Sequence, residues 1–391
     1  MMVHDLVIGG RRVPAVDEAT STVHEPGLGR PMEEVAQAGP ADVRRAVEVA
    51  YRAFTEGPWP GTPATRRGQV LLRVASLVRE RLEEIARVEA RNAGKPIRDA
   101  RAEVAAAADY FEYFGGAANK VFGETIQVQD PGLDVTMREP VGVCALIVPC
   151  NFPVLIATWK LAPALACGNT VVVKPASATP LSALLLADVL VEAGVPEGVV
   201  SVPPGPGATT GTALVTDPRV SKVSFTGSTE VGVRVLAQSA PNVTRVSLEL
   251  GGKSANVVFA DADLERCVPS SVLAVFGNCG QDCCARSRIL IERSVYEEFV
   301  AAFVEHASRL RIGQPLDEAT EVGPMISAGQ RQTTLDYVTV GRQEGARLVA
   351  GGVVPDWPDL QGGWFVAPAV LADVDNRCGS RRRRSSGRSP A

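Results

Sequence analysis

Three of the eight cysteines in this 391-residue chain lie within six positions, at Cys279, Cys283 and Cys284. Such thiols can bind a metal, form disulfides, pack in a core or attack an electrophilic carbon. A structural zinc site needs about four Cys or His ligands. The chain has no C-x-x-C pair, and none of its three histidines lies near the cluster. The sequence therefore predicts no metal site here, and the stretch alone leaves core packing and nucleophilic attack open.

Composition and charge limit the partners of the chain. No uninterrupted apolar run is long enough to span a bilayer, and the first residues, MMVHDLVIGG, do not resemble a secretion signal. We therefore expect a cytoplasmic protein with reduced thiols, no disulfides and no membrane partner. Six of the 40 basic residues are arginines in 377–391, so the remainder has 34 basic and 44 acidic residues, a charge of −10. An acidic body argues against nucleic acid as a main partner.

The elements that must position the cysteines have two different periodicities. Residues 40–120 have apolar side chains at helical spacing, and residues 124–142 alternate around an Asp-Pro-Gly turn as a hairpin does. Five apolar, β-branched runs follow, separated by helical segments, at 143–149, 171–175, 198–204, 220–226 and 243–249. Strands and helices that alternate at this spacing predict β-α-β units, and hence an α/β fold with a parallel sheet.

Polar residues and glycines follow these expected strands. Ligands of parallel sheets bind beyond the carboxyl ends of the strands, which here read PCN, KPAS, PPGPG, FTGSTEVG and LELGG. The dinucleotide fingerprint G-x-G-x-x-G is missing. In isolation GSTEVG (227–232) is either a tight strand-to-helix turn or a helix N-terminus that faces a phosphate. The same two interpretations apply to GPGATTG (205–211).

Five motifs in fixed order resemble those of the aldehyde dehydrogenase superfamily: PCNFP (149–153), KPAS (174–177), FTGSTEVG (225–232), LELGGKSANVV (248–258) and FGNCGQDC (276–283). The resemblance runs from about residue 5 to about residue 376. It implies a Rossmann-like NAD(P)-binding domain at 1–248, with an oligomerisation hairpin at about 124–142, and an incomplete α/β catalytic domain at 249–376. It also implies a small-molecule aldehyde as substrate, and homo-oligomers for the intact members of the family.

The resemblance gives the role of nucleophile to Cys283, the cysteine of G-Q-x-C. A thiolate that adds to an aldehyde forms a thiohemiacetal, whose carbon can release a hydride. The oxyanion needs fixed donors, which in the family are the Asn151 amide and the Cys283 backbone N–H. The family's general base for hydrolysis of the thioester is Glu249, and the two flanking leucines lead us to expect apolar surroundings that raise its pKa. Cys279 and Cys284 are then expected to be small buried residues.

The implied cofactor is NAD or NADP. Lys174 ends an apolar strand, where its ammonium must reach solvent or an anion, and the family uses this lysine on the adenosine ribose. Typical members follow it with a glutamate that binds the ribose hydroxyls, but this chain has Ser177, which would not repel a 2′-phosphate. The matched motifs imply these cofactor-binding residues: Pro149, Cys150, Lys174, Ser177, Gly207, Gly227, Ser228, Gly232 and Leu250.

The last part of the sequence departs from the family pattern. Family members continue with an E-x-F-G-P motif, whose glutamate holds the nicotinamide ribose, and then complete the catalytic domain. Residues 377–391 are instead rich in arginine and cannot build a core, so we expect a basic disordered tail on a truncated chain. Two hypotheses follow. The chain is either an active NAD(P)-dependent aldehyde dehydrogenase or a catalytically inactive remnant of one.

Overall fold

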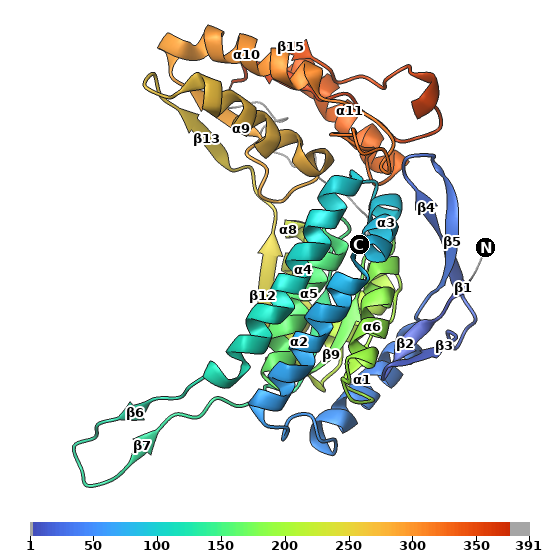
Figure 1. Ribbon diagram of the computed structural model, residues 1–391, viewed down its shortest axis with the longest axis vertical. Helices are drawn as coiled ribbons and strands as arrows, with labels where there is room; N and C mark the ends of the chain where they lie inside the picture. The colour runs from blue at the N-terminus through green and yellow to red at the C-terminus, as the bar shows by residue number, and fades with distance from the viewer. Residues whose placement is uncertain (1–2, 376–391) are drawn as a thin grey trace.

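The computed structural model describes residues 3–375 (Figure 1), so the tail expected at 377–391 lies outside the described residues. The chain begins with five short strands: β1 (Val3–His4), β2 (Leu6–Ile8), β3 (Arg11–Val13), β4 (Thr20–Glu25) and β5 (Arg30–Ala36). β2 and β3 pair as a hairpin, and β5 pairs with both β1 and β4. An antiparallel bridge between Val7 and Val202 attaches the hairpin to the part of the chain that contains the large sheet.

Four helices follow, as the apolar spacing of residues 40–120 predicts: α1 (Pro40–Thr55), α2 (Ala64–Glu80), α3 (Leu82–Ala93) and α4 (Ile97–Ala117). α3 ends at Gly94, whose φ of +83° is the left-handed conformation that favours glycine. Lys95 and Pro96 complete this turn, and Pro96 precedes the first residue of α4. No helix in residues 3–375 combines the length and the hydropathy that a membrane span requires.

The hairpin expected at 124–142 is an extended arm that projects from the body of the molecule (Figure 1). Only two short segments of it pair as strands, β6 (Thr125–Ile126) and β7 (Asp134–Val135). Large apolar side chains on the arm are exposed, including Leu133 at 80% and Met137 at 77%. The turn is therefore where the sequence predicts it, whereas the strand pairing is much shorter. A role for the arm in oligomerisation stays a prediction.

The five apolar runs form the five-stranded parallel sheet that the sequence predicts. The strands are β8 (Val143–Ile147), β9 (Thr170–Lys174), β10 (Val200–Ser201), β11 (Val220–Gly227) and β12 (Arg245–Leu250). Their order in the sheet is β10-β9-β8-β11-β12, so the chain adds β9 on one side of β8 and β11 on the other. Such a reversal opens a crevice beyond the carboxyl ends of the two central strands, here β8 and β11, where ligands of α/β sheets bind.

Helices cover both faces of this sheet (Figure 1). The connecting helices are α5 (Pro153–Ala166), α6 (Leu181–Glu192), α7 (Thr212–Thr216) and α8 (Thr229–Ser239). Leu146 of β8 belongs to a core with α2, α4, α5 and α6, whereas its neighbour Ala145 belongs to a second core with α1, α7 and α8. β8 and β9 are buried over their whole length, as inner parallel strands are, and the edge strand β12 alternates between exposed and half-buried residues.

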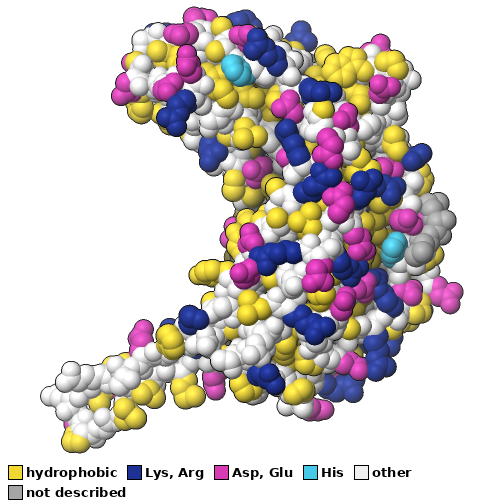
Figure 2. Space-filling view, viewed as in Figure 1, with side chains coloured by type: hydrophobic (Ala, Val, Ile, Leu, Met, Phe, Trp, Pro, Cys, Tyr) yellow, Lys and Arg dark blue, Asp and Glu magenta, His cyan; other side chains and the backbone are white. Residues whose placement is uncertain are grey.

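The chain beyond β12 forms a second group of elements: β13 (Ala255–Val258), α9 (Leu264–Phe276), β14 (Arg288–Ile291), α10 (Tyr296–Arg309), α11 (Ala328–Gln343), β15 (Arg347–Ala350) and β16 (Val370–Ala372). Val258, Phe299 and Phe303 lie in a small core of this group. Figure 2 shows a hollow between the group and the body that contains the sheet. β12 continues to Leu250, so Glu249 is still part of the parallel sheet, and a domain boundary at 248–249 stays a prediction.

Candidate functional site

Every residue that the sequence predicts for the site, except Cys283, lies at or just beyond the carboxyl edge of the parallel sheet. These residues are Pro149, Cys150 and Asn151 after β8, Lys174 and Ser177 at the end of β9, Gly207 after β10, Gly227, Ser228 and Gly232 at the junction of β11 and α8, and Glu249 and Leu250 at the end of β12. The parallel order of the strands explains this grouping, because all five strands end at the same edge.

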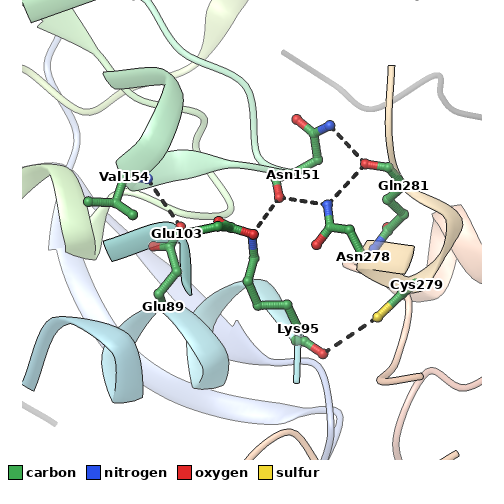
Figure 3. A network of polar contacts seen from close by, with 9 residues as sticks. Glu89, Lys95, Glu103, Asn151, Val154, Asn278, Cys279 and Gln281 are labelled. Carbon is green, nitrogen blue, oxygen red and sulfur yellow. Dashed lines mark hydrogen bonds and ion pairs between the residues drawn. The ribbon is translucent and has the colours of Figure 1, made fainter. Parts of the chain in front are cut away.

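Cys283 comes from the second group of elements, in a loop that follows α9, and hydrogen bonds join this loop to Asn151 (Figure 3). The Asn151 side-chain amide donates to the backbone carbonyl of Gln281 at 2.8 Å, and the Asn278 amide donates to the carbonyl of Asn151 at 3.0 Å. An asparagine amide has two N–H donors, so the bond to Gln281 occupies only one. The structure thus brings the predicted oxyanion donor to the loop of the predicted nucleophile.

The backbone of this loop is left-handed at three consecutive residues. The φ angles are +49° at Asn278, +57° at Cys279 and +70° at Gly280. Asparagine and glycine tolerate this conformation, but for a cysteine it costs about 1–2 kcal/mol. The Cys279 sulfur is buried and accepts the N–H of Gly323 at 3.1 Å, which supports the strained residue. The expected burial is therefore confirmed for Cys279, but it is wrong for Cys284, which lies exposed in the loop between η4 (Gly277–Gly280) and β14.

The Cys283 thiol is half-buried and lies close to other polar groups. Its sulfur is 3.7 Å from the sulfur of Cys284, and the Asp282 carboxylate accepts the N–H of Cys284 at 2.9 Å. Burial, followed by the Cys284 thiol and the Asp282 carboxylate, raises the pKa of Cys283 to about 12. In this state the sulfur is protonated at neutral pH, so it must lose its proton before or during attack. The ligand atoms of these three residues lie within 4.8 Å of one another, which is one donor short of a structural zinc site.

Glu249 does not lie in the apolar surroundings that its leucine neighbours suggest. The residues of β12 alternate, so Leu248 and Leu250 are half-buried whereas Glu249 is exposed. The expectation was wrong because successive side chains of a strand point to opposite faces. No hydrogen bond joins Glu249 to the Cys283 loop within the described part of the chain. Its carboxylate does act electrostatically on Lys160 of α5.

Lys160 is a buried charged residue that sequence reasoning missed. Its ammonium donates to the Ser224 hydroxyl at 2.7 Å, and its residue is only 8% exposed. Burial lowers the pKa of Lys160 to about 8, and the Glu249 carboxylate partly opposes this shift. A signal was present in the sequence, because Lys160 is the only charged residue in the apolar helix PVLIATWKLAPALA.

Lys174 is almost completely buried at the end of β9, with 2% of its surface exposed. Its ammonium donates to the carbonyl of Pro175 at 3.1 Å, and burial lowers the pKa of Lys174 to about 8. A buried ammonium with one neutral acceptor can accept further oxygen ligands. Ser177 lies just beyond, and its hydroxyl donates to the carbonyl of Gly205 at 3.0 Å. The sequence therefore places both residues correctly at this edge.

Close packing explains the two glycines around the start of α8. A Cβ added at Gly227 would lie 2.6 Å from the Phe225 ring, and one added at Gly232 would lie 2.7 Å from Leu250. Ser228 caps the helix, because its hydroxyl accepts the N–H of Val231 at 3.3 Å. These contacts support the interpretation of GSTEVG as a tight strand-to-helix turn. They do not oppose the phosphate interpretation, because the turn also begins an 11-residue helix at the carboxyl edge of the sheet.

Replacement of Lys174 by methionine is expected to stabilise the fold at neutral pH. The pKa is about 8 in the folded chain against 10.5 for the free side chain. The buried charge therefore opposes folding below about pH 8, and this cost disappears as the pH rises from about 8 to about 10.5. The variant should exceed the parent in unfolding free energy by about 2–3 kcal/mol at pH 7 and should lose most of this advantage near pH 10.

Urea unfolding at the two pH values measures this effect, with Lys120→Met as the control. Lys120 is an exposed lysine, and its replacement should not change the difference between the two pH values. A Lys174→Met chain that is less stable than the parent at pH 7 would show that the buried ammonium stabilises the fold.

Comparisons with known proteins agree with this arrangement. The profile of the aldehyde dehydrogenase family matches residues 13–380. A betaine aldehyde dehydrogenase of Bacillus subtilis is 39% identical over 376 residues, which cover 96% of this chain and 77% of that protein. Human retinal dehydrogenase 2 is 43% identical, with coverages of 90% and 68%. The solved NAD+ complex of an aldehyde dehydrogenase from Bacillus cereus superposes with a TM-score of 0.96 at 37% identity, over 99% of this chain and 78% of that one.

Proposed function

Because the chain belongs to the aldehyde dehydrogenase family, we propose that it oxidises an aldehyde to a carboxylic acid, with NAD+ or NADP+ as the hydride acceptor. The hydrogen bond of 2.8 Å between the Asn151 amide and the Gln281 carbonyl carries this proposal. It holds a side-chain amide from the switch point of the sheet against the loop of Cys283. An amide donor fixed beside a thiol suits a reaction in which sulfur adds to a carbonyl and an oxyanion forms.

The residues supply the chemical steps as follows. The Cys283 sulfur gives its proton to solvent water and forms a C–S bond with the aldehyde carbon, whose oxygen takes up the negative charge. The second N–H of the Asn151 amide and the Cys283 backbone N–H donate to the resulting oxyanion. NAD+ or NADP+, when bound beside this carbon, would supply the hydride acceptor, and loss of the hydride would leave a thioester on Cys283. Glu249 then takes a proton from water, the hydroxide adds to the thioester, and the C–S bond breaks to release the carboxylic acid and Cys283.

Residues at the carboxyl edge fit a dinucleotide. The buried ammonium of Lys174 donates to one backbone carbonyl, and the buried hydroxyl of Thr226, near the end of β11, has no hydrogen-bond partner among residues 3–375. Both groups are suited to bind hydroxyl or phosphate oxygens. The remaining residues proposed to hold the dinucleotide are Pro149, Cys150, Ser177, Gly207, Gly227, Ser228, Gly232 and Leu250. The NAD+ complex of the relative from Bacillus cereus supports NAD+ as a ligand.

The test of this function is to mix the chain with NAD+ and a panel of aldehydes and to follow the absorbance of the reduced cofactor. Appearance of the carboxylic acid in equal amount supports the proposal. The rival hypothesis, a catalytically inactive remnant, predicts that the chain binds NAD+ by fluorescence titration but reduces none of it with any aldehyde.

Tolerance of NADP+ is the expected consequence of Ser177. The Ser177→Glu variant should bind NADP+ about tenfold more weakly than the parent does, because a carboxylate near the ribose would repel the 2′-phosphate. Its affinity for NAD+ should change much less. Fluorescence titration of both cofactors measures this, with Ser177→Ala as the neutral control. A parent chain that binds NAD+ but no NADP+ would rule out this account of Ser177.

A further inference from the structure

Lys95 is a buried cation that the proposed chemical steps do not use. It lies in the turn between α3 and α4, and only 2% of its surface is exposed. Its ammonium reaches both carboxylate oxygens of Glu103, with 2.6 Å to Oε1, and the backbone carbonyl of Asn151 at 2.9 Å. These three acceptors match the three N–H donors of the ammonium. The hydrogen bond from Lys95 therefore holds the Asn151 backbone against the turn between α3 and α4 (Figure 3).

Stability alone does not account for this ion pair. Two charges removed from water usually gain little over apolar side chains of the same size. Glu103 is buried, and this burial raises the pKa of its carboxyl to about 7, a rise that the neighbouring Lys95 opposes only in part. The ion pair instead fixes the direction of the Lys95 ammonium, which donates to the backbone carbonyl of Asn151. Asn151 is the residue whose side-chain amide is the predicted oxyanion donor.

The Asn151 carbonyl also accepts a hydrogen bond from the loop that contains Cys283. The Asn278 amide donates to the Asn151 carbonyl at 3.0 Å and also to the Gln281 carbonyl at 3.2 Å. The Gln281 carbonyl in turn accepts the Asn151 amide. Asn151 is therefore tied to Lys95 through its backbone and to the Cys283 loop through both its backbone and its side chain.

A third contact fixes the chain just after Asn151. The buried carboxylate of Glu89 accepts the N–H of Val154 in the first turn of α5 at 3.1 Å. The Lys95 ammonium also lies 4.7 Å from the centre of the Phe152 ring. Residues of α3, of α4 and of the turn between them thus hold the segment from Asn151 to Val154, and the Gly94 carbonyl of the same turn also accepts a contact from the Cys279 thiol at 4.0 Å.

We propose that Lys95, with Glu103 as its counter-ion, is a positioning residue that fixes the Asn151 amide relative to the loop of Cys283. Lys95 acts through the Asn151 carbonyl and takes no part in bond formation. The catalytic part of this inference rests on the proposed function, whereas the structural link from Lys95 to Asn151 does not.

Replacement of both charges, Lys95→Met with Glu103→Leu, removes the link without leaving a buried charge unpaired. In the full chain this variant is expected to retain its fold and to lose about 10- to 100-fold in kcat, because the donor is displaced from the productive geometry. The KM for NAD+ should stay within about twofold of the parent, since Lys95 donates to Glu103 and Asn151, neither of which is among the proposed dinucleotide residues.

The decisive comparison uses Asn151→Ala as a second background. If Lys95 acts through Asn151, adding the charge replacements to Asn151→Ala should lower kcat by less than about twofold further. A purely structural role predicts that the two losses multiply. Arg219→Met is the matched control, since it breaks the partly buried Arg219–Asp217 pair at the start of β11, at the opposite end of the strand from Gly227. It should lower stability and leave kcat unchanged.

Hydrogen exchange tests the link without any turnover. Peptides that cover 149–156 and 278–283 are expected to exchange at least about fivefold faster in the charge-replaced chain, whereas peptides from β11 should not change. Unchanged exchange in both peptides, multiplicative losses, or an unchanged kcat in a folded variant would each overturn the proposal. If the double replacement does not fold, Glu103→Gln should give a smaller loss of kcat, and no loss would contradict the inference. A parent chain that oxidises no aldehyde refutes the proposed function, while the exchange rates still decide the link.

Discussion

Replacement of Cys283 by serine is expected to lower kcat/KM for aldehyde oxidation by at least about 1,000-fold. A hydroxyl is a far weaker nucleophile than a thiolate, and removal of a nucleophile has among the largest effects that a single substitution produces. The rate of NAD+ reduction with a saturating aldehyde measures the loss. Binding of NAD+ should stay within about threefold of the parent, which separates a chemical defect from a folding defect.

Cys284→Ala is the matched control for this experiment. Its thiol lies 3.7 Å from that of Cys283 and contributes to the high pKa of Cys283. Its removal should leave kcat/KM unchanged or raise it modestly at neutral pH, because the remaining thiol ionises more easily. Activity that survives in the Cys283 variant and disappears in the Cys284 variant would move the nucleophile to Cys284.

Replacement of Glu249 by glutamine is expected to lower steady-state turnover by about 100-fold and to leave one round of hydride transfer intact. The amide cannot take a proton from water, so the thioester on Cys283 should accumulate. Rapid mixing with NAD+ and aldehyde should show a burst of reduced cofactor of about one per active site, followed by slow turnover. Mass spectrometry should find the acyl group on the peptide with Cys283.

The control for Glu249 is Glu305→Gln, another exposed glutamate, which pairs with Arg309 on α10. This variant should turn over as the parent does. Loss of the burst together with turnover in Glu249→Gln would mean that Glu249 acts before hydride transfer. Unchanged turnover would remove it from the mechanism.

The parallel sheet could be predicted because its strands depend on a local pattern. Each run, such as that of Val171 to Val173, is apolar and β-branched, and the helices between the runs are long enough for crossovers. The surroundings of Glu249 could not be obtained from its neighbours in sequence, because alternation along an edge strand separates adjacent side chains. The arm shows the same limit, since alternation from 124 to 142 predicted pairing that only four residues make in the structure.

Some residues of the site could likewise be predicted from the sequence, and others could not. The residues at the carboxyl edge follow from strand ends, so their grouping was predictable once the strands were known. Lys95 gave no signal, because a lysine in a glycine–lysine–proline turn is normally solvated, and its partners Glu103 and Asn151 belong to other elements. The contact of Asn278 was equally hidden, because its side-chain amide donates to a carbonyl 127 residues earlier in the chain.

That separation in sequence also sets an order of events during synthesis. Lys95 and Glu103 are synthesised before Asn151, which follows Lys95 by 56 residues, whereas Asn278 is added 127 residues after Asn151. At about 5–20 residues per second, this interval lasts about 6–25 s. Cys283 is added later still, so the reactive thiol is made after every residue on the Lys95 side of the site.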